Sequence, residues 1–444
     1  MALVFEGFHG KIVQCGNEAY EECVYQYAWS SLIDEGIIEP EAILYAQDDA
    51  DVTLGISVDL GTFQKKLGEQ GWFLPMGVCR QVHLGGHVQT GGYGQFTRSF
   101  GLLADYVQKV RIIIADYQVR WAKRGRIKDK DLFYAILDGS PGNFGVLMDV
   151  ILNVLKDDDH PESLGFRAPF PYSEATIKRL LDVMVDQDGM PDTPGDYDYC
   201  LSMMSASPAE GRPVVIVAFA HWANLEGHDQ PHNSGFFEKI LDAGGADKAM
   251  SYLGIFLDGK THTPMSVLCS HWILYVTRVF PFPFHKHTHF SNSNSKALKA
   301  KDWTRWFQYC GGIHSRFLHN AKDGAISFSG RDSHFMSVLA AAYDVSASKD
   351  DEKIAKAWVH KNDSEGVGHP KAKFSTQDRR VLWGSYDLDL PAARKYYFDQ
   401  EPEKYNRLSG IKKMFDPSHV FTPNKFCIGP LPTHVLQCLE KLIQ

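Results

Sequence analysis

The sequence contains no pair of cysteines in a CxxC spacing, although it has eight cysteines in 444 residues. They are scattered along the chain, at Cys15, Cys23, Cys79, Cys200, Cys269, Cys310, Cys427 and Cys438. Zinc knuckles and dithiol redox sites need closely spaced cysteines, and disulfide frameworks are typical of short secreted chains. The pattern therefore favours reduced thiols in the cytosol.

Long apolar runs and a targeting segment are also missing. Nowhere do about 18 apolar residues follow one another, as a membrane-spanning helix requires. The opening residues, MALVFEGFHGKIVQCGNEAY, contain no basic stretch followed by an apolar run and a cleavage site. We therefore expect no signal peptide, no membrane partner and a cytoplasmic location.

Positive charge is in deficit, because the formal net charge is −8. No basic stripe of the kind that binds phosphate backbones is present, which argues against a nucleic-acid partner. Hydrophobic residues at 44% and charged residues at 23% are typical of a folded chain. The length indicates two or three domains.

The apolar periodicity predicts several elements. Helices are expected at 60–68, within the segment DKDLFYAILDG, at 173–187, and near the C-terminus, where Tyr405, Leu408 and Ile411 share a face that Pro417 ends. Strands are expected at AILYA, after the glycine turn in SPGNFGVL, at 213–223, and in a hairpin formed by 110–115 and 119–122. The charged stretch KDDDHPESLG indicates a domain boundary.

The segment GVCRQVHLGGHVQTGGYGQFTR, residues 77–98, has the strongest chemical signal, with six glycines around Cys79 and His87. Glycine lets backbone N–H groups approach a ligand closely, and paired glycines form concave runs of donors that suit pyrophosphate. The alternative is a set of tight turns that bind nothing. A Rossmann fingerprint and a P-loop are both excluded, since neither spacing occurs.

These residues resemble the flavin-binding segment of FAD-linked oxidases of the vanillyl-alcohol oxidase (PCMH-type) fold, in particular the berberine bridge enzyme-like group. The group's pattern is P-x-G-x-C-x-x-V-x-x-G-G-H-x-x-x-G-G-Y-G followed by R-x-x-G-L-x-x-D, and this chain matches each named position from Pro75 to Asp105. The likeness continues through DLFYAILDGSPGNFGVL and YNRLSGIKKMFDPSHVFTPNKF. It is strong over 75–156 and 381–428.

The resemblance implies an α+β fold with three parts. Residues 1–160 would form an FAD-binding domain of two α+β subdomains, of which the first is incomplete. Residues 161–380 would form a substrate domain with a mixed or antiparallel sheet and helices. Residues 381–444 would be a C-terminal segment that returns to the FAD domain.

The resemblance also implies the cofactor, FAD, and the residues that hold it. These are Cys79, Val82, Gly85, Gly86, His87, Gly91, Gly92, Tyr93, Gly94, Gly145, Val146 and Asn424. Cys79 aligns with the cysteine that forms a thioether to flavin C6, which requires a reactive thiolate. Each of three residues has a purely structural alternative. Cys79 could be a buried free thiol, His87 a structural histidine, and Asn424 a turn residue.

One part of the family's pattern is missing. The group has an earlier R-x-G-G-H-x-x-x-G segment, whose histidine bonds the flavin 8α-methyl group, and this chain has no such sequence. EAILYAQDDADV joins TLGISVDLGTF directly near Asp51, Val52 and Thr53, so an internal stretch is absent by comparison with the family. Two smaller departures are Tyr117, at a hairpin turn that favours Asp-Gly, and Asp138, in place of a turn glycine.

Two functions follow from these features. The first is an FAD-dependent oxidoreductase that oxidises a sugar, alcohol or specialised metabolite by hydride transfer to flavin N5, with molecular oxygen as acceptor and Tyr386 as the candidate catalytic residue. The second is a non-catalytic or weakly flavin-binding relative, or an incomplete gene product. A strand tyrosine packed in the core is the alternative for Tyr386. His285, His287 and His289 alternate as on one strand face, and we expect a polar strand there rather than a metal site.

Overall fold

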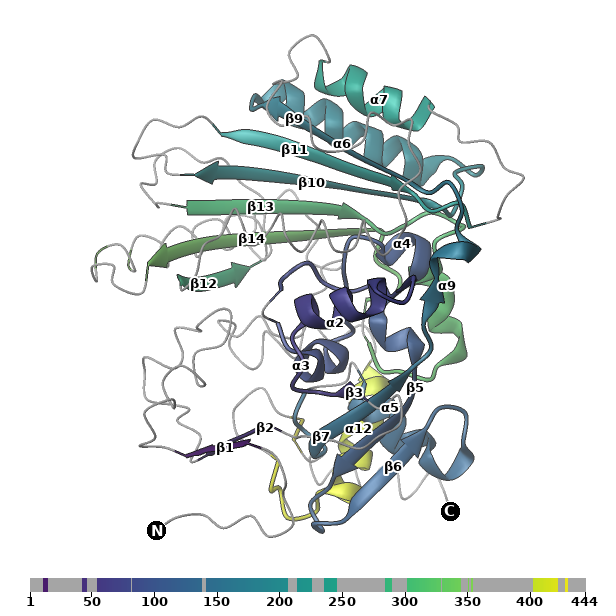
Figure 1. Ribbon diagram of the computed structural model, residues 1–444, viewed down its shortest axis with the longest axis vertical. Coiled ribbons are helices and arrows are strands. Elements are labelled where there is room, and N and C mark those ends of the chain that lie inside the picture. The colour runs from purple at the N-terminus through teal and green to yellow at the C-terminus, as the bar shows by residue number, and fades with distance from the viewer. Residues whose placement is uncertain are drawn as a thin grey trace.

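The computed structural model describes somewhat more than half of the chain. The described residues are 11–14, 42–45, 54–80, 82–137, 141–206, 214–225, 235–245, 284–289, 302–328, 330–344, 350, 353, 402–421 and 428–429. Figure 1 shows two main parts. The upper part is a large sheet with helices above it, and the lower part contains a smaller sheet and its helices.

The smaller sheet is antiparallel, with the strand order β3-β7-β5-β6. Its strands are β3 (Leu54–Gly55), β5 (Val107–Ile113), β6 (Val119–Lys123) and β7 (Val146–Leu152). The helices of this part are α2 (Leu60–Gly68), α3 (Leu84–Gln89) and α5 (Lys130–Ile136). The predicted helix at 60–68, the hairpin, the helix in DKDLFYAILDG and the strand after the SPGNFG turn are confirmed.

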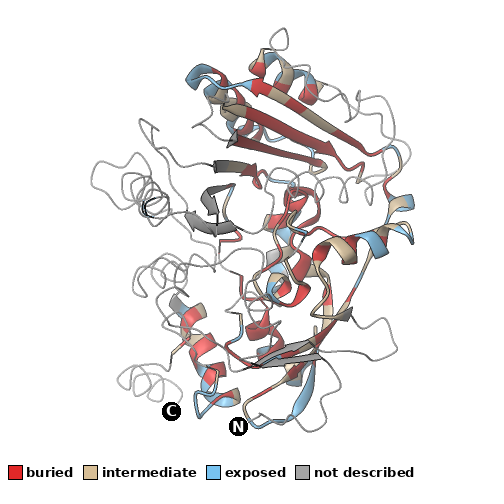
Figure 2. Cartoon of the chain, turned by 60° about the vertical axis from the view of Figure 1, so that its left-hand side comes forward, coloured by how far each residue is buried: buried red, intermediate tan, exposed pale blue. Residues whose placement is uncertain are grey.

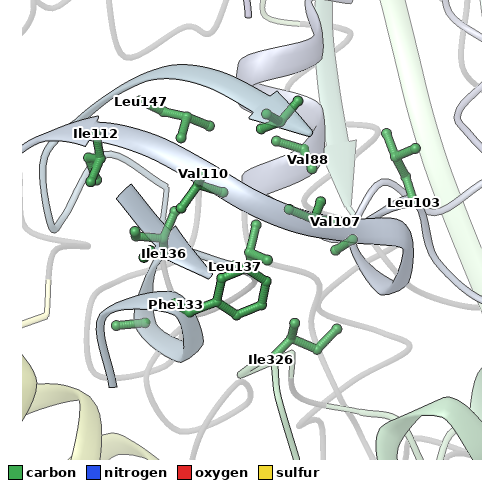
Figure 3. Close-up of a cluster of buried hydrophobic side chains, with 14 of the residues drawn as sticks. Val88, Leu103, Val107, Val110, Ile112, Phe133, Ile136, Leu137, Leu147 and Ile326 are labelled. Atoms are coloured by element: carbon green, nitrogen blue, oxygen red, sulfur yellow. The ribbon is translucent and has the colours of Figure 1, made fainter. Parts of the chain in front are cut away.

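One face of this sheet carries the core of the smaller part. Val110 and Ile112 alternate along β5 toward it, since a strand places every second side chain on the same face, and Val107 joins them across a register shift between Val107 and Lys109. Val88 of α3 and Phe133 of α5 meet them there, and all five side chains are buried (Figure 3). The glycine segment is thus anchored through α3 to the sheet.

The C-terminal helix α12 (Pro402–Phe415) packs on this core through Tyr405, Leu408 and Ile411, as predicted. Its Lys412 is fully buried, and its ammonium lies 2.6 Å from the equally buried carboxylate of Asp416. The same ammonium donates to the backbone oxygens of Asn143 and Phe421. A buried charge is tolerated only with such partners, so the ion pair fixes the chain after α12 against the SPGNFG turn.

The large sheet is antiparallel, with the order β12-β14-β13-β10-β11-β9. Its strands are β9 (Leu164–Pro171), β10 (Tyr197–Ala206), β11 (Val215–Trp222), β12 (Phe284–His289), β13 (Asp302–Tyr309) and β14 (Phe335–Asp344). Two helices lie over one face, α6 (Glu174–Gly189) and α7 (Gly235–Gly244) (Figure 1). The predicted helix at 173–187 and strand at 213–223 are confirmed.

Strand β11 and the described side chains of β10 are buried on both faces of the large sheet (Figure 2). Alternate residues of β10, such as Tyr199 and Leu201, pack with Leu180 of α6 and Phe236 of α7. The residue between them, Cys200, faces the other way and joins a second cluster. That second cluster contains Phe73, Phe96 and Phe100 of the smaller part, together with Val217, Phe219 and Ala223.

Shorter elements complete the described structure. They are β1 (Lys11–Gln14) paired with β2 (Ala42–Tyr45), β4 (Trp72–Phe73) paired with β8 (Leu155–Lys156), the helices α4 (Thr97–Phe100) and α9 (Arg316–His319), and single turns at Leu103–Tyr106, Ile127–Asp129, Asp157–Asp159 and Asn320–Asp323. The strand at AILYA is confirmed as β2. No helix in the described ranges is long and apolar enough to cross a membrane.

A buried polar contact joins the two parts directly after the glycine segment. Asp198 of β10 accepts hydrogen bonds from the backbone N–H groups of Arg98 (3.0 Å) and Ser99 (3.1 Å) in α4. Its other oxygen lies 3.4 Å from Nδ1 of His221. The Arg98 side chain, fully buried, donates to the carbonyl oxygens of Gly311 (2.9 Å) and Tyr197 (2.6 Å). We call Arg98, Ser99, Asp198 and their hydrogen bonds the seam.

Asp105 makes a second link of the same kind. Its carboxylate accepts from the Leu102 N–H (2.9 Å) and the Asn320 side chain (3.1 Å), and it forms an ion pair with Arg331 that is less than 10% exposed on both sides. Arg98 and Asp105 are the charged residues of the R-x-x-G-L-x-x-D pattern. Arg98 therefore holds the glycine segment to the large sheet, and Asp105 holds the residues after it to the segment between β13 and β14.

The β5–β6 hairpin turn contains Tyr117 at φ = 61°, a conformation that costs a residue with a Cβ about 1–2 kcal/mol. Its N–H donates to Ile114 O (2.9 Å), and the Ile114 N–H donates to Gln118 O (3.3 Å). This is a three-residue loop in which glycine is favoured at the left-handed position. The sequence-based expectation of strain at Tyr117 is confirmed.

We expect Tyr117→Gly to raise the free energy of unfolding by about 1 kcal/mol, since the strain is removed while a side chain that is 81% exposed loses little packing. Chemical denaturation measures the change. Tyr117→Ala is the matched control, because alanine keeps the Cβ and should leave stability nearly unchanged. Equal gains in both variants would contradict the strain.

We expect Asp198→Ala to lower the free energy of unfolding by about 3 kcal/mol, because it leaves two buried N–H groups without an acceptor. Asp182→Ala removes an exposed ion pair with Lys178 on α6 and should cost less than about 1 kcal/mol. Denaturant midpoints of the two variants give the comparison. A similar effect in both would show that the seam does not stabilise the fold.

Candidate functional site

The glycine segment begins as a loop and continues as helix α3, a helix that the sequence analysis did not predict. Glycine disfavours helix interiors, but Leu84 and Val88 of α3 are fully buried in the core and hold this turn in place. The N–H groups of Leu84 and Gly85 donate to the oxygens of Val58 (2.9 Å) and Ile56 (3.0 Å). Tertiary packing therefore overrides propensity here.

Two of the predicted cofactor-binding glycines are required by the protein's own packing. A Cβ at Gly94 would lie 1.9 Å from the Met76 carbonyl oxygen, and one at Gly85 would lie 2.8 Å from Cβ of Ile56. The N–H of Gly94 donates to the hydroxyl of Thr97 at 2.9 Å. With their N–H groups bonded to protein oxygens, Gly85 and Gly94 shape the segment.

Gly86 differs from these two. It is exposed, and a Cβ built on it would meet no atom within 4 Å. The open space beside its α-carbon is where a ligand can approach the backbone of α3. Among the predicted cofactor-binding glycines, Gly86 is therefore the one whose surroundings suit a bound group most directly.

Gly91 and Gly92 form the turn after α3, with φ of 91° and 69°. Their carbonyl oxygens accept hydrogen bonds from the N–H groups of Ala104 (3.1 Å) and Leu103 (3.3 Å). A Cβ at Gly92 would come within 2.5 Å of Leu103. The turn thus needs glycine both for its backbone conformation and for the close approach of the next element.

His87 is a positioning residue within the segment. Its Nε2 accepts a hydrogen bond of 2.8 Å from the N–H of Gly77, two residues before Cys79. Burial lowers the pKa of His87 to about 4, so the ring is neutral at physiological pH and remains an acceptor. The histidine fixes the loop that carries the cysteine, and a direct role toward the flavin stays a prediction.

Cys79 has a free thiol and is partly exposed. Its carbonyl oxygen accepts from the N–H of Val82 at 3.2 Å, which makes a tight turn, and Val82 packs against the core of the smaller part. A partly exposed thiol on a fixed loop has the access that covalent attachment needs. The described structure thus suits the functional interpretation of Cys79 better than the alternative of a buried thiol.

Tyr93 packs beside a small cluster that includes Leu102, Cys310 and Phe317. Burial raises the pKa of Tyr93 well above its ordinary value, so the hydroxyl stays protonated. The tyrosine can therefore donate a hydrogen bond but does not serve as a base. Its side chain thus links the glycine segment to the chain at the end of β13.

Gly145 and Val146 lie apart from this segment, at the start of β7. Gly145 has φ = 152°, and a Cβ there would lie 2.2 Å from the Ile113 oxygen. Val146 pairs with Ile113 and is 45% exposed. An exposed apolar side chain at this edge suits the predicted contact with the adenine side, which stays a prediction.

Several sequence predictions fall outside the described residues. They include Tyr386, Asn424, Asp138 and the junction at Asp51, Val52 and Thr53. His285, His287 and His289 occupy alternate positions of β12, as expected for a strand. Within the described part of the chain, no three potential metal-ligating side chains come together.

Sequence reasoning missed the residues of the large sheet that lie on the glycine segment. Gln308 of β13 donates through Nε2 to the carbonyl oxygen of Gly94, and Phe96 makes an edge-on contact with His221 at 4.7 Å between ring centres. The residues of each pair are more than 100 positions apart in the sequence. No local pattern could have indicated the pairing.

The chain matches two family models, each over part of its length. Residues 41–123 match the FAD binding domain, and residues 385–425 match the model described as berberine and berberine like. Together these stretches include all of the glycine segment and most of the C-terminal pattern. They overlap the regions 75–156 and 381–428, over which the sequence resemblance is strong.

Curated relatives agree with these matches. An FAD-linked oxidoreductase, pynB, of Aspergillus niger is 33% identical over 132 residues, which are 29% of this chain and 24% of the relative. Berberine bridge enzyme-like 12 of Arabidopsis thaliana is 45% identical over 74 residues, 17% of this chain and 13% of the relative. The matched stretches thus span a quarter or less of the relatives' length.

The likeness in fold extends further along the chain. Glucooligosaccharide oxidase of Acremonium strictum, described with a 6-S-cysteinyl, 8α-N1-histidyl FAD, superposes with a TM-score of 0.63 over 85% of this chain and 78% of its own, at 17% identity. This similarity shows the α+β fold of the vanillyl-alcohol oxidase type. Over these stretches its sequence motifs are similar to those of berberine bridge enzyme-like FAD-linked oxidoreductases, and its fold is similar to that of a berberine bridge enzyme.

Proposed function

We propose that the chain is an FAD-dependent oxidase that oxidises a small organic substrate, such as a sugar, an alcohol or a specialised metabolite. The observation that carries the proposal is one loop and helix that present a free, partly exposed Cys79 and an open backbone at Gly86, beneath the large sheet. The oxidase names of the relatives and structural neighbours support it.

The residues of this segment fit FAD in three respects. Gly86 leaves room at the backbone, and His87 holds the Cys79 loop through Gly77. Val78, next to Cys79, packs against the face of the large sheet that is turned toward the smaller part. When bound, FAD would accept a hydride at N5 and pass its two electrons to molecular oxygen, which gives hydrogen peroxide. A protein base takes the remaining proton, and Tyr386 stays our candidate for that role.

Attachment through Cys79 would join its sulfur to flavin C6. The thiol hydrogen and the ring hydrogen leave as protons, and the two electrons released go to oxygen. The second attachment known from the bicovalent neighbour needs a histidine segment that this sequence lacks, so a single thioether is the link available to this chain.

A second function, that of a non-catalytic or weakly flavin-binding relative, is favoured by the junction at Asp51, Val52 and Thr53. There the sequence lacks the segment that grips the pyrophosphate in the family. The two functions differ in one measurable property, which is whether the purified protein holds FAD in stoichiometric amounts and consumes oxygen. A colourless protein after reconstitution would favour the second.

We expect Gly86→Ala to stabilise the apoprotein by about 0.5–1 kcal/mol and to weaken FAD binding about tenfold. The gain comes from replacing a helix glycine at a site with no steric conflict, and the loss from filling the space that the cofactor would approach. Thermal denaturation and flavin fluorescence titration measure the two effects. Gly410→Ala, at an equally open position in α12, is the control and should change stability alone.

If Gly86→Ala and Gly410→Ala bind FAD equally well, the flavin does not approach α3. Gly94→Ala is the opposite case. Its Cβ would meet the Met76 carbonyl, so it should destabilise the apoprotein and cannot report on ligand contact.

We expect Cys79→Ala to release the flavin during acid precipitation, while the wild type keeps it bound to the polypeptide. The physical reason is that the alanine variant has no sulfur to attach at C6. Absorbance of the pellet and supernatant in the blue range measures the partition. Cys200→Ala, which changes a fully buried thiol, is the control and should retain the colour. Flavin that washes completely out of the wild type would contradict covalent attachment.

A further inference from the structure

Two buried glutamines lie where the glycine segment touches the large sheet at Gly94: Gln95 is its neighbour in the sequence, and Gln308 bonds its carbonyl oxygen. Gln95 follows Gly94 and is 3% exposed, and Gln308 of β13 is 1% exposed. Gln308 donates through Nε2 to the Gly94 oxygen. Its Oε1, and both Oε1 and Nε2 of Gln95, are buried without a hydrogen-bond partner.

Trp306 adds a third polar atom on the same side of the sheet. It stands two residues before Gln308 on β13, so the two side chains share a face. The register pairs Gln308 with Cys200 and Trp306 with Ser202, which places both on the face toward the smaller part. The indole stacks on Phe219 at 6.0 Å between centroids, while its Nε1 is buried and unpartnered.

Leaving these four buried polar atoms of Gln95, Gln308 and Trp306 without hydrogen bonds would lower the stability of the fold. More than nine in ten buried polar groups in folded proteins have a partner, and each lost one costs about 1–3 kcal/mol. Gln95 has no partner at either end of its amide. Two donors, Nε2 of Gln95 and Nε1 of Trp306, and two acceptors, the Oε1 atoms, are therefore left without a partner around the junction of the glycine segment with β13.

The charge of a ligand group that would pair with these atoms follows from the residues around them. Gln95, Gln308 and Trp306 are uncharged, so none of them can neutralise an ion. The nearby carboxylate of Asp198 is already used by the N–H groups of Arg98 and Ser99. An ionised ligand group would be buried without a counter-charge, which is strongly unfavourable. An uncharged group that both donates and accepts hydrogen bonds fits the arrangement.

We propose that Gln95, Gln308 and Trp306 form a recognition site for an uncharged hydroxyl or imide edge, between the glycine segment and the large sheet. Two sources supply this chemistry: the hydroxyls of a neutral polyol substrate, and the pyrimidine edge of the flavin. The inference rests on the proposed function for the identity of the ligand, but not for the existence of the site.

Gln95→Met tests the site, because methionine has a similar volume and no polar end. The variant should keep or exceed the thermal midpoint of the wild-type apoprotein, since it removes a desolvated amide. It should also bind its ligand about tenfold more weakly, which corresponds to one lost hydrogen bond of about 1.4 kcal/mol. Gln187→Met is the matched control, because Gln187 is a buried glutamine of α6, on the opposite side of the sheet.

Two binding measurements on the full chain separate the sources. The first is the dissociation constant of FAD, by quenching of flavin fluorescence. The second is the dissociation constant of cellobiose, a neutral disaccharide, by calorimetry on the wild type and variants, with D-glucuronate as the charged comparison. A tenfold loss for FAD alone identifies the flavin edge, and a tenfold loss for cellobiose alone identifies the substrate. Either supports the site when Gln187→Met binds normally.

The remaining outcomes overturn one proposal or both. If FAD binds to the wild type and Gln95→Met changes neither constant, the recognition site is wrong and the proposed function stands; a structural water then accounts for the amides. If the wild type binds no FAD but its affinity for cellobiose depends on Gln95, the proposed function fails and the site stands. Binding of neither probe, or stronger binding of D-glucuronate than of cellobiose, overturns the site.

Discussion

The carboxylate of Asp198 fixes how the two parts of the molecule pack against each other. It accepts from two consecutive backbone N–H groups of α4, and those N–H groups follow the glycine segment directly. Moving the N–H groups away from an acceptor buried this deeply costs much free energy, because neither water nor another side chain can replace it. These two hydrogen bonds therefore fix the position of the glycine segment relative to strand β10 of the large sheet. The contacts of Gln308 with Gly94 and of Phe96 with His221 follow from that placement.

Much of the family's sequence pattern serves this architecture rather than a ligand. Arg98 and Asp105 bind the large sheet and the segment around Arg331. Lys412 and Asp416 bind each other and the SPGNFG turn. A match to the pattern therefore indicates first that the two parts are held in the family's arrangement, and only then that a flavin is held between them. This explains why a motif match gives the fold more directly than it gives the activity.

The elements with strong local signals could be predicted from sequence. Helix α2 has apolar residues at helical spacing and Asp59 as its N-cap, and α6 begins at the capping Ser173. The short helix α3 could not, because Gly85 and Gly86 disfavour a helix and only the burial of Leu84 and Val88 stabilises it. For the candidate site, the resemblance indicated Cys79 and the glycines. Gln95 and Gln308 carried no signal, since their meaning depends on a contact between residues more than 200 positions apart.

Because the family's histidine segment is absent, each remaining contact would contribute a larger part of the binding free energy of the flavin. In this chain the N–H groups of Gly85 and Gly94 are already bonded within the protein, so the glycine segment offers fewer free donors than its glycine content suggests. Recognition then depends on Gly86, on the Cys79 loop that His87 holds, and on polar atoms that reach the segment from the large sheet. A covalent bond through Cys79 also matters more in such a site, because it retains a cofactor that non-covalent contacts hold only weakly. In the functions proposed above, the unpartnered amides of Gln95 and Gln308 and the free thiol of Cys79 would complement each other in a site that lacks the histidine segment.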